Sequence, residues 1–354
     1  SKAELERQRY EAASAIGDEL AAEVRFRRST ISPRRLLLQR FAIHQHGLQF
    51  LIEMRAELQP FLKTERQLAA LDLELEDMLS TWCDISLLEF RAINWDSPAS
   101  LIERLIRYEA VHDIRSWSDM KKRLEGDRRC YGFFHHRMAG IPLIFIEVAL
   151  MNEVPATIAP VIDETRLPTD QRNASVAVFY SISNTQAGLR GIPFGDSLIK
   201  RVVEELANEF QKLKIFVTLS PMPGYRQWLQ KSIDHELEGL GAKRLKLLDS
   251  ITGSDRSRKN IVLQLPEGPS AQSAQEPETL GLISSIHLSL AARYLTTLDE
   301  VGEPIDPVAR FHLGNRARIE RINWAADPSA KGLKQAFGLM VNYVYDLKRL
   351  DRTR

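Results

Sequence analysis

The spacing of apolar residues changes near residue 125, and this change limits the fold more than any other feature of the chain. In residues 36–58 and 68–85, apolar side chains recur at intervals of three, four and seven, which is typical of packed amphipathic helices. From "RRCYGFF" onward the runs are β-rich, and two of them flank a turn at residues 138–140 as hairpin strands do. We therefore predict a helical bundle over residues 1–125 and an α+β or α/β domain over residues 126–354.

The second domain contains strand, loop, helix and strand in that order. A buried strand, "SVAVFYSIS", precedes a loop with glycines, a helix with an apolar stripe over residues 198–210, and the strand "KIFVTLS". This order predicts a crossover unit with its site near the carboxyl ends of the strands. The remaining expectations are a polar connection over 238–278, a helix over 279–298, a strand pair around 309–324 and a closing helix from 328 toward 345.

Charge and cysteine content limit the binding partners and the cellular compartment that we expect for this protein. The 48 basic and 47 acidic side chains of the 354 residues nearly cancel, so we expect neither nucleic acid nor a membrane as partner. No apolar run approaches the roughly 20 residues that a membrane span needs. Cys83 and Cys130 are too few for a disulfide framework or a zinc site and fit a reducing compartment, here the cytoplasm. The sequence opens on Ser1 rather than Met, so a removed organelle-targeting segment stays open as an alternative.

A glycine-bearing loop is the first candidate site. Gly188, Gly191 and Gly195 lie between the buried strand and the start of a helix, where bare amides and the helix dipole favour a phosphate. Arg190 would add charge. The loop is neither a Walker A sequence nor a G-x-G-x-x-G fingerprint, and an ordinary connecting loop is the alternative. Its layout is similar to the loop with which acyltransferases of the GNAT superfamily bind the pyrophosphate of coenzyme A.

A serine at the end of a strand is the second candidate. In "VTLSPMPGY", Pro221 and Pro223 fix their own φ angles and bias Ser220 toward extended backbone. A hydroxyl held on so stiff a turn suits chemistry, although Ser-Pro also opens ordinary turns.

Histidine spacing gives no metal site. The pairs 44 and 46, on a predicted helix, and 135 and 136, on a predicted strand, each point apart, so we expect no metal ion. His312 differs because it ends an apolar segment just before Gly314 and Asn315, although a histidine of this kind, taken alone, is more often structural.

Several separate stretches together resemble malonyl-CoA decarboxylase, in the same order and at similar spacing over about residues 30–345. These stretches are "EAVHDIRSWSDMKKRL" with "RRCYGFF", "FYSISNTQAGLRGIPFGDSLIKRVVEELANEF", "TLSPMPGYRQWL", and "PVARFHLGNRARIERINWAADPSAKG" through "GLMVNYVY". The resemblance implies an N-terminal helical domain that forms a homo-oligomer, dimer or tetramer, and a catalytic domain with an acetyltransferase-like mixed β-sheet and flanking helices. The implied reaction, part of fatty acid metabolism, converts malonyl-CoA to acetyl-CoA and carbon dioxide.

The resemblance also implies the site. Ser220 in "LSP" and His312 in "FHL" match the catalytic serine and histidine of the family, and Tyr345 in "NYVY" matches an active-site tyrosine. The segment that matches the coenzyme A loop comprises Arg190, Gly191, Ile192, Pro193, Phe194, Gly195 and Asp196. In two places the chain departs from the family: proline stands at 193 where animal members carry glutamate, and Arg316 stands where glycine is expected.

The chemistry of the residues agrees with this reading. Loss of carbon dioxide from a malonyl thioester leaves an enolate, whose oxygen needs hydrogen-bond donors and whose carbon needs a proton. A hydroxyl and an imidazole supply both, and the thioester itself accepts the electrons, so we expect no metal or organic cofactor. Two alternatives stay open: an acyltransferase that uses the same coenzyme A loop, and an acyl-CoA-binding sensor that has lost catalysis, for which the arginine at 316 is the argument.

Overall fold

The chain divides into two compact units. The computed structural model describes residues 2–14, 19–168, 170–192, 195–252, 255–264 and 277–346. The first unit comprises residues 1–89, 134–141 and 186–192, and the second comprises residues 90–133, 142–185 and 193–354. Residues 90–125 thus belong to the second unit, although the change of periodicity near residue 125 predicts them as part of the helical bundle.

The first unit is built from helices. They are α1 (Lys2–Ser14), α2 (Glu19–Thr30), α3 (Pro33–Ile43), α4 (Gly47–Leu58), α5 (Ala69–Trp82) and the short 3₁₀ helices η1 (Gln59–Lys63), η2 (Arg66–Leu68), η3 (Ile85–Leu87) and η5 (Ala187–Leu189). One core cluster joins α3, α4 and α5 through the buried side chains of Leu38, Ala42, Leu51, Leu75 and Met78. The predicted helices are confirmed here: Leu51, Leu75 and Met78 of the predicted apolar pattern lie in this core, whereas α3 contributes Leu38 and Ala42, which were not part of that pattern.

The second unit contains a mixed sheet with helices around it. Its strands are β1 (Leu88–Ile93), β2 (Arg128–His135), β3 (Pro142–Met151), β4 (Val176–Asn184), β5 (Ile215–Thr218), β6 (Ser220–Pro221), β7 (Arg318–Asn323) and β8 (Met340–Tyr345). Its helices are α6 (Ala99–Tyr108), α7 (Trp117–Leu124), α8 (Ala159–Ile162), α9 (Gly195–Glu209), α10 (Tyr225–Glu238), α11 (Ala242–Thr252), α12 (Asp255–Leu263), α14 (Pro277–Thr296), α15 (Pro307–Gly314), α16 (Ala330–Ala336) and the 3₁₀ helix η4 (Gln171–Asn173).

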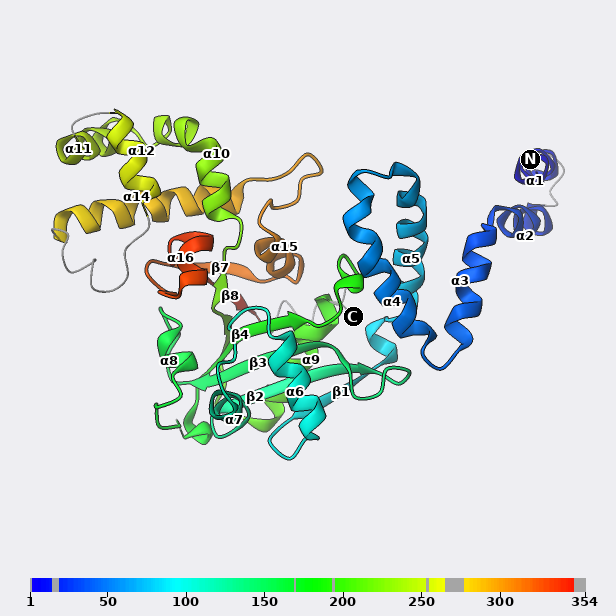
Figure 1. Cartoon of the computed structure of the whole chain (residues 1–354), viewed down its shortest axis with the longest axis horizontal. Coiled ribbons are helices and arrows are strands. Elements are labelled where there is room, and N and C mark those ends of the chain that lie inside the picture. Colours follow the sequence, from blue (N-terminus) through cyan, green and yellow to red (C-terminus); the bar gives the residue numbers. More distant parts are fainter. Residues whose placement is uncertain are drawn as a thin grey trace. The chain divides into compact units, whose positions relative to one another are not determined.

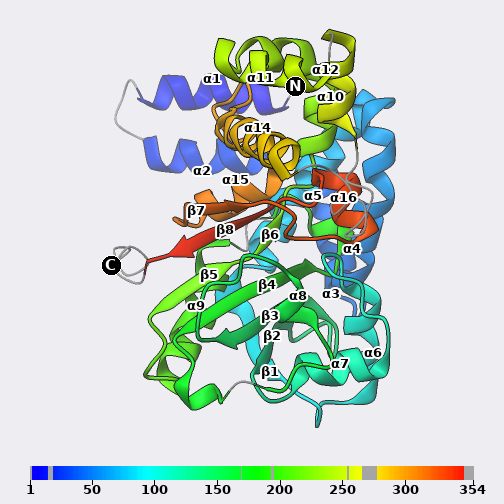
Figure 2. The same ribbon diagram turned by 90° about the vertical axis from the view of Figure 1, so that its left-hand side faces the viewer.

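The eight strands follow the order β1-β2-β3-β4-β5-β8-β6, with β7 also paired to β8. β3 and β4 are antiparallel, β4 and β5 are parallel, and β8 runs antiparallel to β5, β6 and β7. The parallel pair is joined through α9, as the strand, loop, helix and strand order predicted. Helices α6 and α7 lie on one side of the sheet and α9 on the other (Figures 1 and 2). The α+β class is therefore confirmed.

Three segments differ from the sequence expectation. Much of the predicted polar connection over 238–278 is helical, since it contains α11 and α12, and residues 265–276 of it lie outside the described residues. The first half of the predicted strand pair is α15, which begins where Asp306 accepts hydrogen bonds from the amides of Val308 and Ala309, with Pro307 in the first turn.

The predicted closing helix is mostly a strand. Only α16 is helical, and it ends at Phe337, whose φ of 52° lies in the left-handed region, followed by Gly338 with φ 80°. Two successive left-handed residues stop a helix. The chain then enters β8, whose pairing with β5, β6 and β7 decides its conformation.

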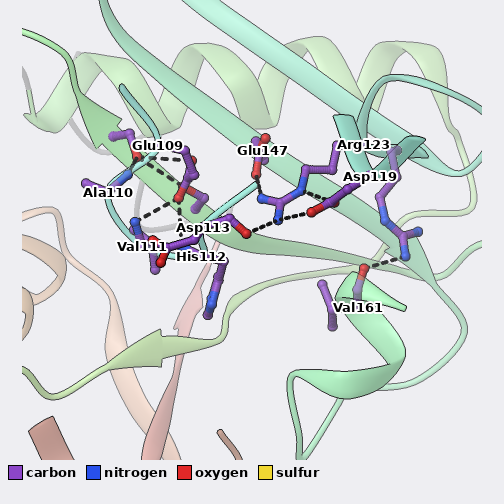
Figure 3. Close-up of polar contacts among 12 residues, drawn as sticks. Glu109, Ala110, Val111, His112, Asp113, Asp119, Arg123, Glu147 and Val161 are labelled. Atoms are coloured by element: carbon purple, nitrogen blue, oxygen red, sulfur yellow. Dashed lines mark hydrogen bonds and ion pairs between the residues drawn. The ribbon is translucent and has the colours of Figure 1, made fainter. Parts of the chain in front are cut away.

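A cluster of buried charged side chains links α7 to the sheet (Figure 3). Arg123 of α7 binds Asp119 of the same helix at 2.8 Å and Glu147 of β3 at 3.1 Å, and the three residues are at most 4% exposed. Nearby, Glu109 accepts hydrogen bonds from the hydroxyls of Ser181 and Ser183 on β4. These contacts hold the residues after α6 and the start of α7 on β3 and β4.

Candidate active site

Ser220 is placed by a local interruption of the central sheet. β5 and β6 pair with β8 in one continuous register, but the strand is interrupted between them at Leu219, directly after Thr218. At this break the Thr218 hydroxyl oxygen accepts from the amide of Tyr343 at 3.2 Å, in place of a regular strand contact. Because side chains two residues apart on an extended strand share a face, Thr218 and Ser220 lie together, and the Ser220 hydroxyl donates to Thr218 Oγ1 at 2.9 Å.

The three predicted catalytic residues meet in one hydrogen-bonded chain. Ser220 Oγ lies 3.0 Å from His312 Nε2, and His312 Nδ1 lies 2.7 Å from the hydroxyl of Tyr345. Since the Ser220 proton goes to Thr218, the serine oxygen accepts from Nε2–H of the imidazole, and Nδ1 accepts from the Tyr345 hydroxyl. The sequence placed Ser220 and His312 92 positions apart, and the fold brings them into contact.

Burial keeps this chain of groups uncharged. Ser220 is 6% exposed, His312 3% and Tyr345 2%. Removal from water disfavours the imidazolium and lowers the pKa of His312 to about 3, and the same desolvation raises the pKa of Tyr345. The partner of Nδ1 is a phenol rather than a carboxylate. His312 is therefore a neutral imidazole that donates through Nε2.

His312 is held by the end of α15. The amide of Ala317 donates to the carbonyl of His312 at 3.0 Å, and the amide of Arg316 donates to Leu313 at 3.0 Å. This pair of bonds is a Schellman motif, which requires a left-handed residue at the position of Arg316. Arg316 has φ 62°, so it takes the conformation that glycine would take there. The departure from the family at 316 leaves the turn intact, which removes the argument for an inactive sensor.

Replacing Arg316 with glycine is expected to raise the free energy of unfolding by up to about 1 kcal/mol, because a left-handed arginine is strained. The β-branched variant Arg316→Val should lower it by roughly 1–2 kcal/mol. Urea unfolding at pH 7 checks both values. A large stabilisation by valine would show that the turn does not need a left-handed residue.

Sequence reasoning missed three residues that complete the site. Thr218 accepts a hydrogen bond from Ser220, and the ring of Tyr343 lies tilted against that of His312 with centroids 4.6 Å apart. The amide nitrogen of Asn342, which is fully buried, donates to the carbonyl of Thr218 at 2.8 Å. A period-two signal could have found Thr218 from Ser220, and Tyr343 from Tyr345, because alternate residues of a strand share a face.

The predicted coenzyme A loop is only partly described. Arg190 and Gly191 are exposed and Ile192 is buried, and these residues belong to the first unit. Gly195 and Asp196 begin α9 in the second unit, while Pro193 and Phe194 lie outside the described residues. Between β4 and α9 the described part of the connection contains η5 and the exposed residues Arg190 and Gly191, which agrees with the predicted order of strand, loop and helix.

The cysteines take no part in this site. Cys83 and Cys130 are free and buried, and burial raises the pKa of the Cys83 thiol to about 12. Thiols of that kind are poor nucleophiles and metal ligands. Within the described ranges, no group of three or more His, Cys, Asp or Glu side chains is arranged to hold a metal ion. In the same part of the chain, no helix combines the length and apolarity that crossing a membrane requires.

Comparison with known proteins agrees with the geometry. Residues 1–83 match the family model "Malonyl-CoA decarboxylase N-terminal domain", and residues 86–354 match "Malonyl-CoA decarboxylase C-terminal domain". The mitochondrial malonyl-CoA decarboxylase of Rattus norvegicus is 36% identical over 341 residues, which cover 93% of this chain and 68% of that protein.

Solved structures give the same result. Malonyl-CoA decarboxylase from Rhodopseudomonas palustris is 38% identical, with a TM-score of 0.83 over 99% of this chain and 81% of that one. The enzyme from Cupriavidus metallidurans is 44% identical, with a TM-score of 0.72 over 94% of this chain and 77% of that one. Together with the family models, these similarities show that the chain belongs to the malonyl-CoA decarboxylase family.

Proposed function

We propose that this protein converts malonyl-CoA to acetyl-CoA and carbon dioxide at Ser220 and His312. The observation that supports the proposal most directly is the buried, uncharged chain from Ser220 through His312 to Tyr345. In a serine hydrolase the histidine becomes an imidazolium and a carboxylate stabilises it. Here desolvation lowers the pKa of His312 and a phenol binds its Nδ1, so the group is suited to donating hydrogen bonds rather than to activating a nucleophile.

In the proposed reaction the bond between the carboxylate carbon and the α carbon breaks. Its electron pair passes into the thioester to form an enolate, and carbon dioxide leaves. When substrate binds, the hydroxyl of Ser220 turns from Thr218 to the developing enolate oxygen, and the Nε2–H of His312, which otherwise donates to Ser220, is the second donor. The α carbon then takes a proton from His312 or from a water that it holds, and solvent restores that proton. The thioester accepts the electron pair, so no step is assigned to a metal ion or an organic cofactor.

The coenzyme A moiety of the substrate is proposed to bind at residues 190–196. This assignment rests on the match to the family's loop and on its place before α9 (Gly195–Glu209). Backbone amides at the start of a helix attract phosphate, and the exposed Arg190 adds a cation.

Purified protein should produce acetyl-CoA and carbon dioxide in equal amounts from malonyl-CoA alone, with a rate unchanged by a metal chelator. Chromatography of the thioesters and release of labelled carbon dioxide measure both products. Transfer of the acyl group to an added amine would favour the acyltransferase alternative. Binding of malonyl-CoA without product would favour the sensor.

The rate constant kcat is expected to vary less than about threefold between pH 5 and 8. His312, with a pKa of about 3, stays neutral over this range, whereas an ordinary histidine titrates near pH 6.5. A lowered histidine pKa means that the unfolded state binds the proton better, so His312 favours folding above about pH 6.5 and this contribution is lost as the pH falls toward 3. Circular dichroism at each pH separates unfolding from catalysis. A fall in kcat above pH 6.5 would instead indicate an imidazolium as proton donor.

The helical unit is proposed to form a homo-oligomer. Leu36, Leu37 and Phe41 belong to the apolar pattern of α3, yet they are 50%, 55% and 40% exposed, while Leu38 and Ala42 face the core. A second copy of the chain would bury the exposed side chains. Light scattering coupled to gel filtration should give a dimer or tetramer, and the Leu37→Glu/Phe41→Glu variant should shift it toward monomer.

The cytoplasm is the proposed compartment, in keeping with the free thiols of Cys83 and Cys130. Cell fractionation with an antibody against the protein tests this assignment, and recovery in an organelle would contradict it.

A further inference from the structure

The loop that leaves β4 is held tightly by α4 within the first unit. Gly188 of η5 lies so close to this helix that a Cβ atom built on it would stand 1.8 Å from the carbonyl oxygen of Ile52. Real side chains do not tolerate such a distance, so only glycine permits this approach. The backbone of η5 therefore packs directly on the backbone of α4.

One buried arginine of α4 binds the loop through hydrogen bonds. Arg55 of α4 is 2% exposed, and its Nη1 donates to the carbonyl oxygens of Gly188 and Arg190, both at 2.9 Å. On its other sides, Nε donates to Asp72 at 2.9 Å and Nη2 donates to Glu76 at 2.7 Å. The guanidinium thus connects α4 with α5 and with the loop. Its two loop partners, Gly188 and Arg190, are 133 and 135 positions from Arg55 in the chain.

These bonds set the direction of the loop amides. In a trans peptide the N–H points away from the C=O of the same unit. When Arg55 binds the carbonyl of Arg190, the amide of Gly191 must point away from α4. Gly191 is exposed and has φ 86°, a conformation that suits glycine.

The charge of Arg55 is already balanced. Asp72 and Glu76 bring two carboxylates to a single guanidinium, so the group as a whole carries no surplus positive charge. Arg55 therefore affects the loop through the fixed directions of its guanidinium hydrogen bonds, and not through attraction of its charge for phosphate.

We infer that Arg55 is a positioning residue for coenzyme A: it orients the peptides of residues 188–190 so that the amide of Gly191 faces the pyrophosphate of the substrate. This inference rests on the proposed function of the loop. It gives α4 a role in holding this loop, separate from any role in oligomerisation.

The test compares two substrates. Arg55→Lys retains the charge but loses the planar guanidinium, and it should raise the KM for malonyl-CoA about tenfold while kcat changes less than about threefold, because the loss affects binding. The truncated thioester malonyl-S-N-acetylcysteamine has no pyrophosphate, so its kcat/KM should change less than about threefold. Hydrogen exchange should quicken in residues 186–192 while the α4–α5 core stays protected.

Two further variants complete the design. Arg34→Gln removes an ion pair between α3 and α5, made with Glu74 at 3.1 Å, without touching the loop, so it should leave both substrates unaffected. If Arg55→Lys does not fold, Asp72→Asn is the alternative. It weakens only the ion pair between Arg55 and residue 72, and it should raise the KM for malonyl-CoA about threefold.

The outcomes separate this inference from the proposed function. Wild-type KM for malonyl-CoA in a folded Arg55→Lys variant, or an equal loss with the truncated thioester, would overturn the positioning role and leave the decarboxylase standing. A wild-type protein that neither binds coenzyme A nor turns over malonyl-CoA would overturn both.

Discussion

Replacing His312 with asparagine is expected to lower kcat for malonyl-CoA by about 10²–10⁴-fold, since the variant loses both a donor to the enolate and a route for the proton. Ser220→Ala should cost about 10²–10³-fold through loss of a single donor. The two groups share a 3.0 Å hydrogen bond and act as a unit, so the double variant should be little worse than His312→Asn alone. Single-turnover kinetics with saturating malonyl-CoA measures the chemical step.

A second buried histidine offers the matched control. His287 is 1% exposed, hydrogen-bonds to Tyr225 at 3.1 Å and, like His312, has a pKa that burial lowers, here to about 4. His287→Asn should reduce stability and leave kcat within about threefold when assayed below its melting temperature. Equal losses of kcat in the two variants would mean that the His312 effect arises from damaged folding.

Replacing Arg123 with methionine is expected to lower the free energy of unfolding by about 3–5 kcal/mol at pH 8, because Glu147 would be left buried without its cation. Burial already raises the pKa of Glu147 to about 8, and loss of Arg123 would raise it further.

The pH dependence of this defect has a definite sign. In the variant the folded state holds a proton on Glu147 that the unfolded state releases above its ordinary pKa near 4.5. Wild type keeps the same proton up to about pH 8, so the defect should be nearly constant between pH 5 and 7 and should grow above pH 8, where wild type ionises Glu147 beside Arg123 and the variant does not. Urea unfolding of wild type and variant at pH 6 and pH 9.5 measures this difference.

The isosteric variant Glu147→Gln serves as the control, since it leaves Arg123 paired with Asp119 at 2.8 Å. Its cost should stay below about 1.5 kcal/mol, in the range of one ordinary buried hydrogen bond. A defect in Arg123→Met that grows toward low pH would contradict this account of Glu147.

Local patterns predicted much of the fold because they depend on residues a few positions apart. Helical periodicity predicted the helices α3–α5, and two β-rich runs on either side of a turn at 138–140 predicted the β2–β3 hairpin. The strand, loop, helix and strand order predicted the crossover from β4 to β5. The same local reasoning failed for residues 309–317 and 340–345, where a helix cap and central sheet pairing decided the structure.

The sequence by itself determined the α+β class, the family, and a serine held on a stiff turn between a strand and two prolines. Only the tertiary structure decided that Ser220 meets His312 over 92 positions, that Thr218 and Tyr343 complete this site, and that Arg55 binds carbonyls 133 and 135 positions away. The physical reason is the sequence separation of the interacting residues. Propensity, capping and turn chemistry act between neighbours in the chain, whereas these contacts form only after the sheet and the helices have packed. They therefore produce no periodic pattern in the sequence.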